Sequence, residues 1–451
     1  MVSGSVVQLY NRNMRGWVEP ADAFVMLFAN DDHAFWLDRL NAGSKRFSVI
    51  GHAYNSTPLA TAEMFSQLAA RRQWPTEVLG DEPPFDFRPG FVGWFDYLQD
   101  PLASAEIAGS WLDVREALIF DHDARRIFLM GYFTDATRFE EWVKAAMIRL
   151  PLAGGSQIRF LQKHANSSLP VLKSLAHGRR DYLAMIDSAK EHIKSGDVYQ
   201  ICLTNQIRYQ HQSNPLDVFL RLRQTNPSPY SNFIRCNQKT LVSSSPEQFL
   251  TVSAAGLAST SPIKGTRARH ELADEDQALA DELLSNAKER AENLMIVDLM
   301  RNDLGRVSQV DSVRVSQLFR VETHATVHQL VSSVEAQLRP DVGLPEVISS
   351  VFPAGSMTGA PKIRAMQIID ELEGVPRGVY SGAAGYLGID GSADLGMVIR
   401  SLMFEADEVS IGVGGGITID SDPQAEFDEI RLKAKALLDV LRVQDPWASA
   451  C

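Results

Sequence analysis

Cysteine is scarce in this chain, with three residues among 451: Cys202, Cys236 and Cys451. Their number is odd, their spacings are wide and no CxxC pair occurs, so we expect neither a disulfide framework nor a zinc site. An excess of positive charge is also missing, because 44 Lys and Arg face 56 Asp and Glu and the formal net charge is -12. Proteins that bind phosphate backbones usually carry the opposite balance, so no nucleic-acid partner is expected.

Long hydrophobic runs are missing as well. No uninterrupted apolar run is long enough to span a bilayer, and the N-terminal residues lack the apolar core of a signal peptide. We therefore expect no membrane partner and a cytoplasmic location. What is present is 45% hydrophobic and 22% charged residues, over a length that allows a large core and one to three domains.

The order of apolar and turn-forming segments predicts the organisation of the chain. Residues 1–150 mix short β-type runs with turns, 151–175 are turn-rich and are the predicted linker, and 176–442 hold the motifs described below. Apolar residues at helical spacing predict helices at 180–196, 275–304, 361–372 and 423–441. Strand-like runs cluster between these helices, which favours an α+β fold with antiparallel sheets over a regular βαβ winding.

Two pairs of carboxylates are spaced to share a helical face. They are Glu289 with Glu292 and Glu426 with Glu429, and each face continues into apolar residues. Acidic residues near a helix start also interact favourably with the helix dipole, so either pair alone has a simple structural explanation. Two pairs facing one another across a cleft would repel without a cation between them, and carboxylates without His or Cys favour Mg²⁺.

Several other residues are ambiguous when taken singly. The run Gly412–Gly416 suits an anion-binding nest of backbone N–H groups, but a tight hairpin is the simpler interpretation. Arg400 lies in the apolar, strand-like run GMVIRSLMF, where a guanidinium needs a carboxylate partner from the protein or from a ligand. Lys264, Glu247 and His328 each fit a structural role as well as a catalytic one.

Taken together, the motifs resemble the chorismate-utilising enzymes, a family that includes anthranilate synthase component I, aminodeoxychorismate synthase component I, and isochorismate and salicylate synthases. The matching runs are GDVYQICLTNQ, SSSPEQFL, SPIKGTRAR, KERAENLMIVDLMRNDLGRV, FPAGSMTGAPKIRAMQIIDELE, RGVYSGAAGYLG, MVIRSL and GVGGGITIDSDPQAEFDEIRLKAKAL. The resemblance implies one large α+β unit with two antiparallel sheets flanked by helices and an active site in a cleft. Residues 1–150 resemble the more variable companion region of the same family, and 176–442 its chorismate-binding catalytic region.

The resemblance also implies a role for individual residues. Mg²⁺ would be held directly by Glu292 and Glu429, with Glu289 and Glu426 helping through water. Chorismate would be bound by residues from several motifs, namely Arg400, Tyr380, Gly414, Gly416, Ser356, Lys433, Gly265 and Thr266. Glu247 matches the family's general acid, and His328 matches a histidine near the substrate ring.

Two positions bear on which reaction the resemblance implies. Isochorismate-forming members carry a water-activating lysine where this chain has Gln200, and an amide is not a base. Anthranilate synthases typically read PIAGT, whereas PIKGT, with Lys264, is the pattern of aminodeoxychorismate synthase component I. There the lysine is implied to attack ring carbon 2 while the 4-hydroxyl leaves, and ammonia then adds at carbon 4 and expels the lysine. Only a neutral amine can attack in this way.

The implied product is 4-amino-4-deoxychorismate, used for p-aminobenzoate and folate synthesis. No glutaminase Cys/His arrangement is visible in the sequence, so ammonia is expected from a separate glutamine amidotransferase subunit or from solution. Two alternatives stay open: anthranilate synthase component I, and a chorismate-binding subunit without catalytic activity.

Overall fold

Two large sheets, packed face to face and covered by helices on their outer sides, form the body of the protein. We describe it from a computed structural model that covers residues 7–40, 46–55, 57–99, 107–165, 168–324 and 327–448. A core of buried side chains from both sheets, including Trp94, Leu112 and Ile234, fills the space between them. Because each sheet buries one face against the other and the opposite face under helices, the expected α+β fold with two sheets is confirmed.

Within the described residues the larger sheet has 13 strands, which pair antiparallel except for β1 with β4. Its strand order is β18 (Gly359–Ala360), β10 (Gln200–Gln210), β22 (Glu408–Ile417), β21 (Ser401–Glu405), β12 (Lys239–Ser245), β11 (Tyr230–Cys236), β2 (His33–Asp38), β3 (Phe47–His52), β7 (Glu116–Asp121), β8 (Arg126–Phe133), β1 (Gln8–Met14) and β4 (Val78–Gly80), with β9 (Val171–Leu175) paired to β10.

The smaller sheet has nine strands in the described part of the chain and carries the PIKGT motif at one edge. Its order is β15 (Ile263–Ala268), β17 (Val327–Gln337), β14 (Leu257–Ser261), β13 (Gln248–Val252), β20 (Ala393–Met397), β19 (Ala383–Gly388), β5 (Gly90–Phe95) and β6 (Gly109–Asp113), with β16 (Arg314–Thr323) paired to β17.

Helices cover the outer face of each sheet. Those packed on the larger sheet are α1 (Pro20–Phe28), α3 (Ala136–Arg149), α5 (Arg179–Lys194), α6 (Pro215–Thr225), α10 (Lys362–Glu373) and α11 (Pro423–Leu441). Those packed on the smaller sheet are α2 (Thr61–Ala70), α8 (Ala287–Gly305) and α9 (Leu344–Val351), while α7 (Ala273–Ser285) lies against β15 to β17. The short pieces are α4 (Ser156–Lys163), η1 (Leu150–Leu152) and η2 (Gly355–Met357).

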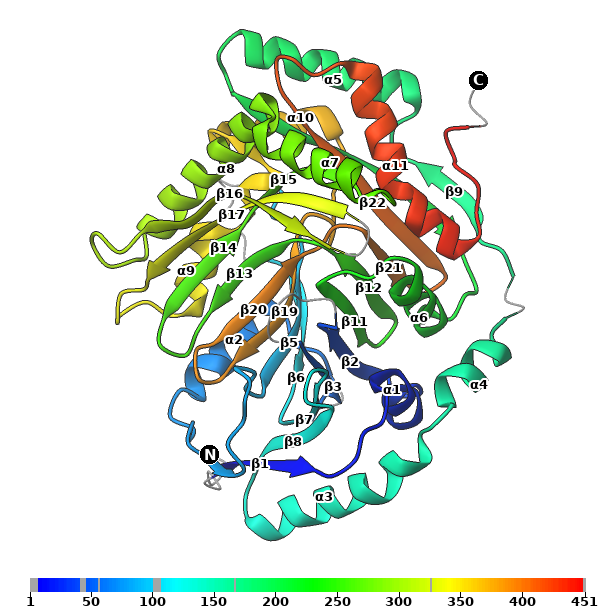
Figure 1. Ribbon diagram of the computed structural model, residues 1–451, viewed down its shortest axis with the longest axis vertical. Coiled ribbons are helices and arrows are strands. Elements are labelled where there is room, and N and C mark those ends of the chain that lie inside the picture. Colours follow the sequence, from blue (N-terminus) through cyan, green and yellow to red (C-terminus); the bar gives the residue numbers. More distant parts are fainter. Residues whose placement is uncertain are drawn as a thin grey trace.

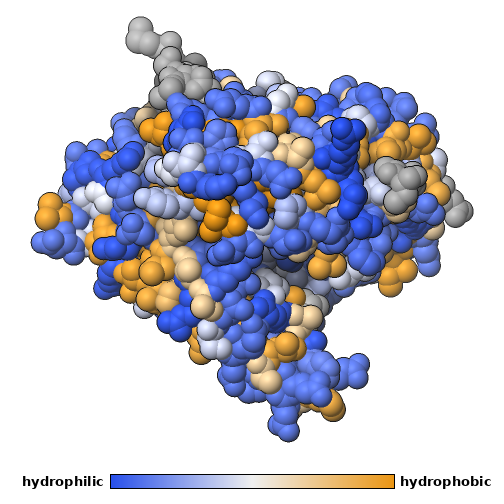
Figure 2. Space-filling view, turned by 90° about the horizontal axis from the view of Figure 1, so that it is seen from above, coloured by the Kyte–Doolittle hydropathy of each residue, from blue (hydrophilic) through white to orange (hydrophobic). Residues whose placement is uncertain are grey.

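Helices α5, α10 and α11 lie together at one end of the molecule, and the N-terminal strand β1 and helix α3 lie at the other (Figure 1). Seen from the end that carries α5, α10 and α11, the surface is mostly hydrophilic, with apolar side chains in separate patches (Figure 2). Among the described helices, none is long and apolar enough to cross a membrane.

Both sheets cross the predicted boundary at residue 150. In the larger sheet β2 pairs with β11, and in the smaller one β5 pairs with β19. The predicted linker, 151–175, includes α4 and strand β9, which continues the larger sheet through its pairing with β10. The division of the chain into regions 1–150 and 176–442 stays a prediction. In the structure, strands from both regions pair with one another in each sheet.

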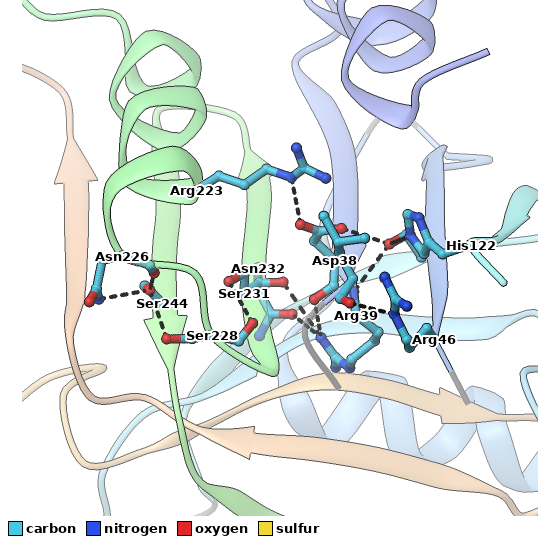
Figure 3. A network of polar contacts seen from close by, with 12 residues as sticks. Asp38, Arg39, Arg46, His122, Arg223, Asn226, Ser228, Ser231, Asn232 and Ser244 are labelled. Carbon is cyan, nitrogen blue, oxygen red and sulfur yellow. Dashed lines mark hydrogen bonds and ion pairs between the residues drawn. The ribbon is translucent and has the colours of Figure 1, made fainter. Parts of the chain in front are cut away.

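A buried polar network lies where β2 meets β11 (Figure 3). Asp38 accepts hydrogen bonds from Arg223 at 2.6 Å and from the Ser48 hydroxyl at 2.6 Å, and Arg39 donates to Asn232 at 3.0 Å. Burial alone would raise the pKa of Asp38, but the charge of Arg223 and these hydrogen bonds hold it below its usual value. The ionised carboxylate therefore ties the N-terminal strands to the helix α6 that carries Arg223.

Three local predictions were wrong in detail. The single helix expected at 275–304 is broken at Asn286, which has extended backbone and whose side chain caps α8 by accepting from the Glu289 N–H at 3.1 Å. Arg400 was expected inside a strand but lies between β20 and β21 with φ of 49°, in the left-handed region. The glycines 412–416 form no hairpin turn, because they continue strand β22.

Candidate functional site

The motif residues of the candidate site come from six segments of the chain. Strand β22 of the larger sheet supplies the glycines, and strand β15 of the smaller sheet supplies Lys264. Glu247 precedes β13, Ser356 lies in η2, and the carboxylates stand in the first two turns of α8 and α11. Asp422 caps α11 by accepting from the Ala425 N–H at 2.8 Å, and Pro423 takes the first helical position.

Lys264 points toward the glycine strand. Its Nζ lies 3.3 Å from the place where a Cβ on Gly416 would stand, and Gln200 Nε2 lies 2.6 Å from the same point. Lys264 is half-buried, and no ion pair or hydrogen bond holds its ammonium among the described residues. The PIKGT motif therefore places the Lys264 amine beside strand β22, where the glycines have no side chains to fill the space.

Glu247 is a buried carboxyl group close to this amine. It is 7% exposed, and its Oε1 accepts a hydrogen bond from the Ser356 hydroxyl at 2.9 Å. Burial raises the pKa of Glu247 to about 7, although the Ser356 hydrogen bond and the charges of Lys264 and Lys433 act in the opposite direction. A carboxyl group of this kind is partly protonated near neutral pH, which suits a general acid.

The glycines of β22 leave room for close approach from one side. A Cβ on Gly412 would lie 2.1 Å from Cγ of Tyr380, so the tyrosine ring packs on bare backbone. Lys433, from α11, donates to the carbonyl oxygen of Gly414 at 2.8 Å and pairs with Glu429 at 2.7 Å. Burial raises the pKa of Tyr380, which keeps its hydroxyl available as a hydrogen-bond donor.

Arg400 is half-buried and lies outside the strands, because its backbone adopts the left-handed conformation. Within the described part of the chain, no carboxylate forms an ion pair with its guanidinium, and its electrostatic neighbour is Glu247. A desolvated guanidinium without a protein partner can take a carboxylate from a ligand.

Carboxylates from α8 and α11 face a shared cation. The ammonium of Lys288 lies 3.9 Å from Oε1 of Glu292 and 4.0 Å from Oε1 of Glu426, so one positive charge bridges the two helices. The side chains of Glu292 and Glu426 are 13% and 9% exposed, whereas half of the Lys288 side chain is exposed to solvent. Glu426 also accepts from the Ser421 hydroxyl at 2.7 Å.

The electrostatics of these carboxylates differ. Burial raises the pKa of Glu292 and of Glu426, and neighbouring carboxylates add to the effect in both cases. Burial would raise the pKa of Glu429 too, but the adjacent Lys433 ammonium holds it below its usual value. Buried carboxylates that repel one another and have a cation between them match the chemistry of a divalent-metal site.

The residues present fit Mg²⁺ by their chemistry, since they offer oxygen donors alone. Over the described ranges, however, no three His, Cys, Asp or Glu side chains are already gathered as a metal cage. Glu289 in particular faces Arg267, whose Nη1 lies 3.4 Å from its Oε1. Glu289 also covers Gly265, which has φ of 84° and where a Cβ would lie 2.9 Å from the Glu289 carboxyl carbon. Thr266 is exposed on β15.

His328 is buried on β17, and protein groups occupy both of its ring nitrogens. Nδ1 lies 2.9 Å from the Thr323 hydroxyl, and Nε2 lies 2.9 Å from Oδ1 of Asp276. Asp276 in turn pairs with Arg269 at 2.7 Å. A role for His328 near a substrate ring stays a prediction.

Sequence reasoning did not find every residue of the site. Lys288 directly precedes Glu289, so the helical spacing that paired the glutamates also places Lys288 one turn before Glu292. Ser421 and its bond to Glu426 depend on the turn before α11, for which the sequence gives no clear signal. The ion pair of Glu373 with Arg377, 2.6 Å long and 1% exposed on both sides, was also missed.

Comparison with known proteins places this geometry in a family. Residues 26–439 match the model of the chorismate binding enzymes. The chain is 38% identical to aminodeoxychorismate synthase of Streptomyces griseus, over 94% of this chain and 63% of that protein. It is 35% identical to anthranilate synthase component 1 of Streptomyces coelicolor, over 97% of this chain and 89% of that protein.

A solved structure agrees. Anthranilate synthase component I from Streptococcus pneumoniae superposes with a TM-score of 0.71 at 30% identity, covering 87% of this chain and 92% of that one. The chain spans less than two thirds of the length of the S. griseus relative. The family match covers every candidate site residue and every named strand except β1, and the chain therefore belongs to the chorismate binding enzyme family.

Proposed function

We propose that this chain is component I of an aminodeoxychorismate synthase, which converts chorismate and ammonia to 4-amino-4-deoxychorismate and water. The observation that carries the proposal is Lys264, an unpaired amine directed at the bare backbone of Gly416. The similarity to aminodeoxychorismate synthases supports it, as does the lysine in PIKGT, the position at which the sequence departs from the anthranilate synthase pattern.

In this proposal the two carboxylates of chorismate are bound separately. Arg400, Tyr380 and the N–H groups of Gly414 and Gly416 hold the enolpyruvyl carboxylate, and Ser356 lies close to it. Lys433 holds the ring carboxylate, and Gly265 and Thr266 line the substrate. The unpaired guanidinium of Arg400 and the open glycine strand support this arrangement, because a dicarboxylate needs a cation and N–H donors at separate places.

The bond changes follow from the positions of Lys264 and Glu247. The neutral amine of Lys264 forms a C–N bond at ring carbon 2, both conjugated ring double bonds shift by one position, and the 4-hydroxyl leaves as water with the proton of Glu247. Ammonia then forms a bond at carbon 4, both double bonds shift back, and Lys264 departs as an amine. Glu247, ionised after the first step, accepts a proton released when the ammonium product is neutralised.

Mg²⁺ would be held directly by Glu292 and Glu429, and through water by Glu289 and Glu426. When bound, it would neutralise the ring carboxylate of chorismate. The pairing of Lys288 with both Glu292 and Glu426 supports a cation position between α8 and α11, and the exposure of Lys288 allows it to move aside.

We further propose that ammonia comes from a glutamine amidotransferase subunit and that the product serves p-aminobenzoate and folate synthesis. Glutamine hydrolysis of this kind uses a reactive thiolate. Cys202 and Cys236 are buried and free, and burial raises the pKa of both thiols, so neither suits that role; Cys451 lies outside the described residues.

Identification of the product tests the proposal. The protein is incubated with chorismate, Mg²⁺ and an ammonium salt, and the products are separated by chromatography and identified by mass spectrometry. The proposal expects 4-amino-4-deoxychorismate. Anthranilate as the product would overturn it in favour of anthranilate synthase component I, the second candidate, which the match over 89% of the S. coelicolor protein supports. Chorismate bound but unchanged would favour a subunit without catalytic activity.

A further inference from the structure

Strand β10 lies next to the glycine-containing strand β22, and part of its opposite edge pairs with no strand. On one side it pairs with β22, so that Cys202 lies opposite Gly416 and Thr204 opposite Gly414. On its other side, β18 pairs with Gln200 and Ile201 and β9 pairs from Ile207 onward. Between these two pairings the buried backbone groups need other partners, because an unpaired buried amide is costly.

One buried ion pair supplies two of those partners, at Cys202 and Thr204. Glu373, at the end of α10, accepts from the Thr204 N–H at 2.8 Å, and Arg377 donates to the Cys202 carbonyl at 2.8 Å. The two side chains hold each other by bonds of 2.6 and 2.8 Å, and each is 1% exposed. Glu373 and Arg377 thus take the place of a neighbouring strand along β10.

The same guanidinium reaches the turn that carries Ser356. Nη1 of Arg377 donates to the carbonyl oxygen of Met357 at 2.7 Å, and Cζ of Arg377 lies 4.4 Å from the centre of the Tyr97 ring. Met357 follows Ser356 in η2, and Ser356 is the residue whose hydroxyl binds Glu247. The Cys202 N–H also donates to the Thr358 carbonyl at 2.7 Å, and β18 pairs with β10 just beyond η2. Arg377 adds a side-chain link between η2 and β10, and the fork of an arginine fixes direction as well as charge.

We propose that Arg377, held by Glu373, is a positioning residue: it fixes η2 against β10 and thereby holds the Ser356 hydroxyl on Glu247, opposite the glycines of β22. The inference rests on the proposed function in that Glu247 is taken as the general acid. Neither Arg377 nor Glu373 touches the substrate in this account. Both act through the two segments that they join.

The test uses Arg377→Lys, which keeps a charge but cannot bond Met357, Cys202 and Glu373 together. Arg71→Lys is the matched control, because Arg71 is also a buried arginine, paired bidentately with Asp113 at 2.6 and 2.8 Å in the N-terminal part. Two measurements are made on the full chain. The first is the titration of the Glu247 carboxyl group without substrate, by difference infrared spectroscopy against Glu247→Gln. The second is kcat and KM for chorismate with ammonia.

We expect Arg377→Lys to raise the titration midpoint of Glu247 by roughly half a pH unit or more, because a loosened Ser356 hydroxyl stabilises the carboxylate less. We expect kcat to fall on the order of tenfold to a hundredfold with a smaller change in KM. Arg71→Lys should lower stability but leave the Glu247 midpoint in place. An unchanged midpoint in Arg377→Lys, or equal shifts in both variants, would overturn the inference.

The titration needs no turnover, so it separates the two proposals. If the wild type does not aminate chorismate but Arg377→Lys shifts the Glu247 midpoint, the proposed function fails and the positioning role stands. If Arg377→Lys does not fold, Glu373→Gln, which keeps an acceptor for Thr204, takes its place in both measurements. If neither folds while Arg71→Lys does, the pair is a requirement for folding and the positioning role is rejected.

Discussion

The hydroxyl of Ser356 donates a hydrogen bond of 2.9 Å to the buried carboxyl group of Glu247, and this bond joins two motifs that lie 109 residues apart. A hydrogen bond to a carboxylate favours its charged form, so Ser356 moderates the upward shift that burial imposes on the pKa of Glu247. The balance leaves that pKa at about 7, where the group can exist in both protonation states during a reaction.

Ser356→Ala should therefore raise the pKa of Glu247. If protonated Glu247 is the general acid, activity falls as pH rises through its pKa, and the alkaline limb of kcat/KM should move to higher pH in this variant. The pH profile of kcat/KM with ammonia in constant, saturating neutral form checks it. An alkaline limb that stays in place or moves to lower pH would show that the hydroxyl does not act on this group.

Glu247→Gln should lower kcat by about 10²- to 10⁴-fold, since the leaving hydroxyl loses its proton donor.

The same Glu247→Gln change should also alter the pH dependence of the free energy of unfolding. The folded-state pKa of Glu247, about 7, lies above its ordinary value of 4.5, so folding favours the protonated form, and stability is lost as pH rises through 7. Glutamine has no such loss. Denaturant unfolding should show a gain for the variant relative to wild type of up to about 3 kcal/mol at pH 8 compared with pH 5. The same difference at both pH values would contradict the shifted pKa.

Gly416→Ala should reduce activity strongly while the protein still folds. Its Cβ would lie 2.6 Å from Gln200 Nε2 and 3.3 Å from Lys264 Nζ, so these flexible side chains must move out of the site. The neighbouring Gly415→Ala is the control, because its Cβ meets its nearest atom, Glu426 Oε2, at 3.4 Å. We expect a loss of about 10²-fold in kcat/KM for the former and a smaller loss for the latter. Similar activity in the two variants would argue against crowding around Lys264.

Glu292→Gln and Glu429→Gln should each weaken Mg²⁺ binding by about tenfold or more, as measured by calorimetry on the protein alone. Glu335→Gln, which removes a half-buried carboxylate paired with the exposed Arg314 at 2.9 Å, serves as the control. Binding isotherms that match wild type in both site variants would remove these carboxylates from the proposed metal site.

Asp38→Asn should destabilise the protein by about 3–5 kcal/mol, because it leaves the Arg223 guanidinium without its buried partner. The pKa of Asp38 is held below its ordinary value, so its contribution to stability is present above that value and is lost as pH falls through the lowered pKa. Urea unfolding at pH 7 and at pH 3 measures both effects. A wild-type midpoint for the variant at pH 7 would show that the network contributes little.

Local chemistry explains which parts of the fold and site were predictable from sequence. The sequence marks the end of α5 by Gly196 and the start of α11 by Asp422 and Pro423, because caps and breakers act within one helical turn. The two glutamate pairs were found because helical spacing fixes which residues share a face, whereas Lys433 was named through the family resemblance.

Long-range relationships were not available from the sequence. The pairing of β2 with β11 joins residues about 200 positions apart, and no local signal specifies it. Arg400 was placed in a strand because its neighbours are apolar, whereas its backbone takes a left-handed conformation that hydrophobic pattern does not report. Glu373 and Arg377 look like ordinary helix-end residues until β10 is placed beside them.

The central claim is that Lys264 forms a bond to the substrate, and intact-protein mass spectrometry tests it most directly. The protein is mixed with chorismate and Mg²⁺ without ammonia, the reaction is quenched with acid, and the intact mass is measured. A digest then locates any adduct, and the Lys264→Ala variant is treated in parallel. The account predicts an adduct with the mass of chorismate less one water, on the peptide that contains Lys264 and absent from the variant. No adduct on Lys264, together with Lys264→Ala aminating chorismate at the wild-type rate, would contradict it.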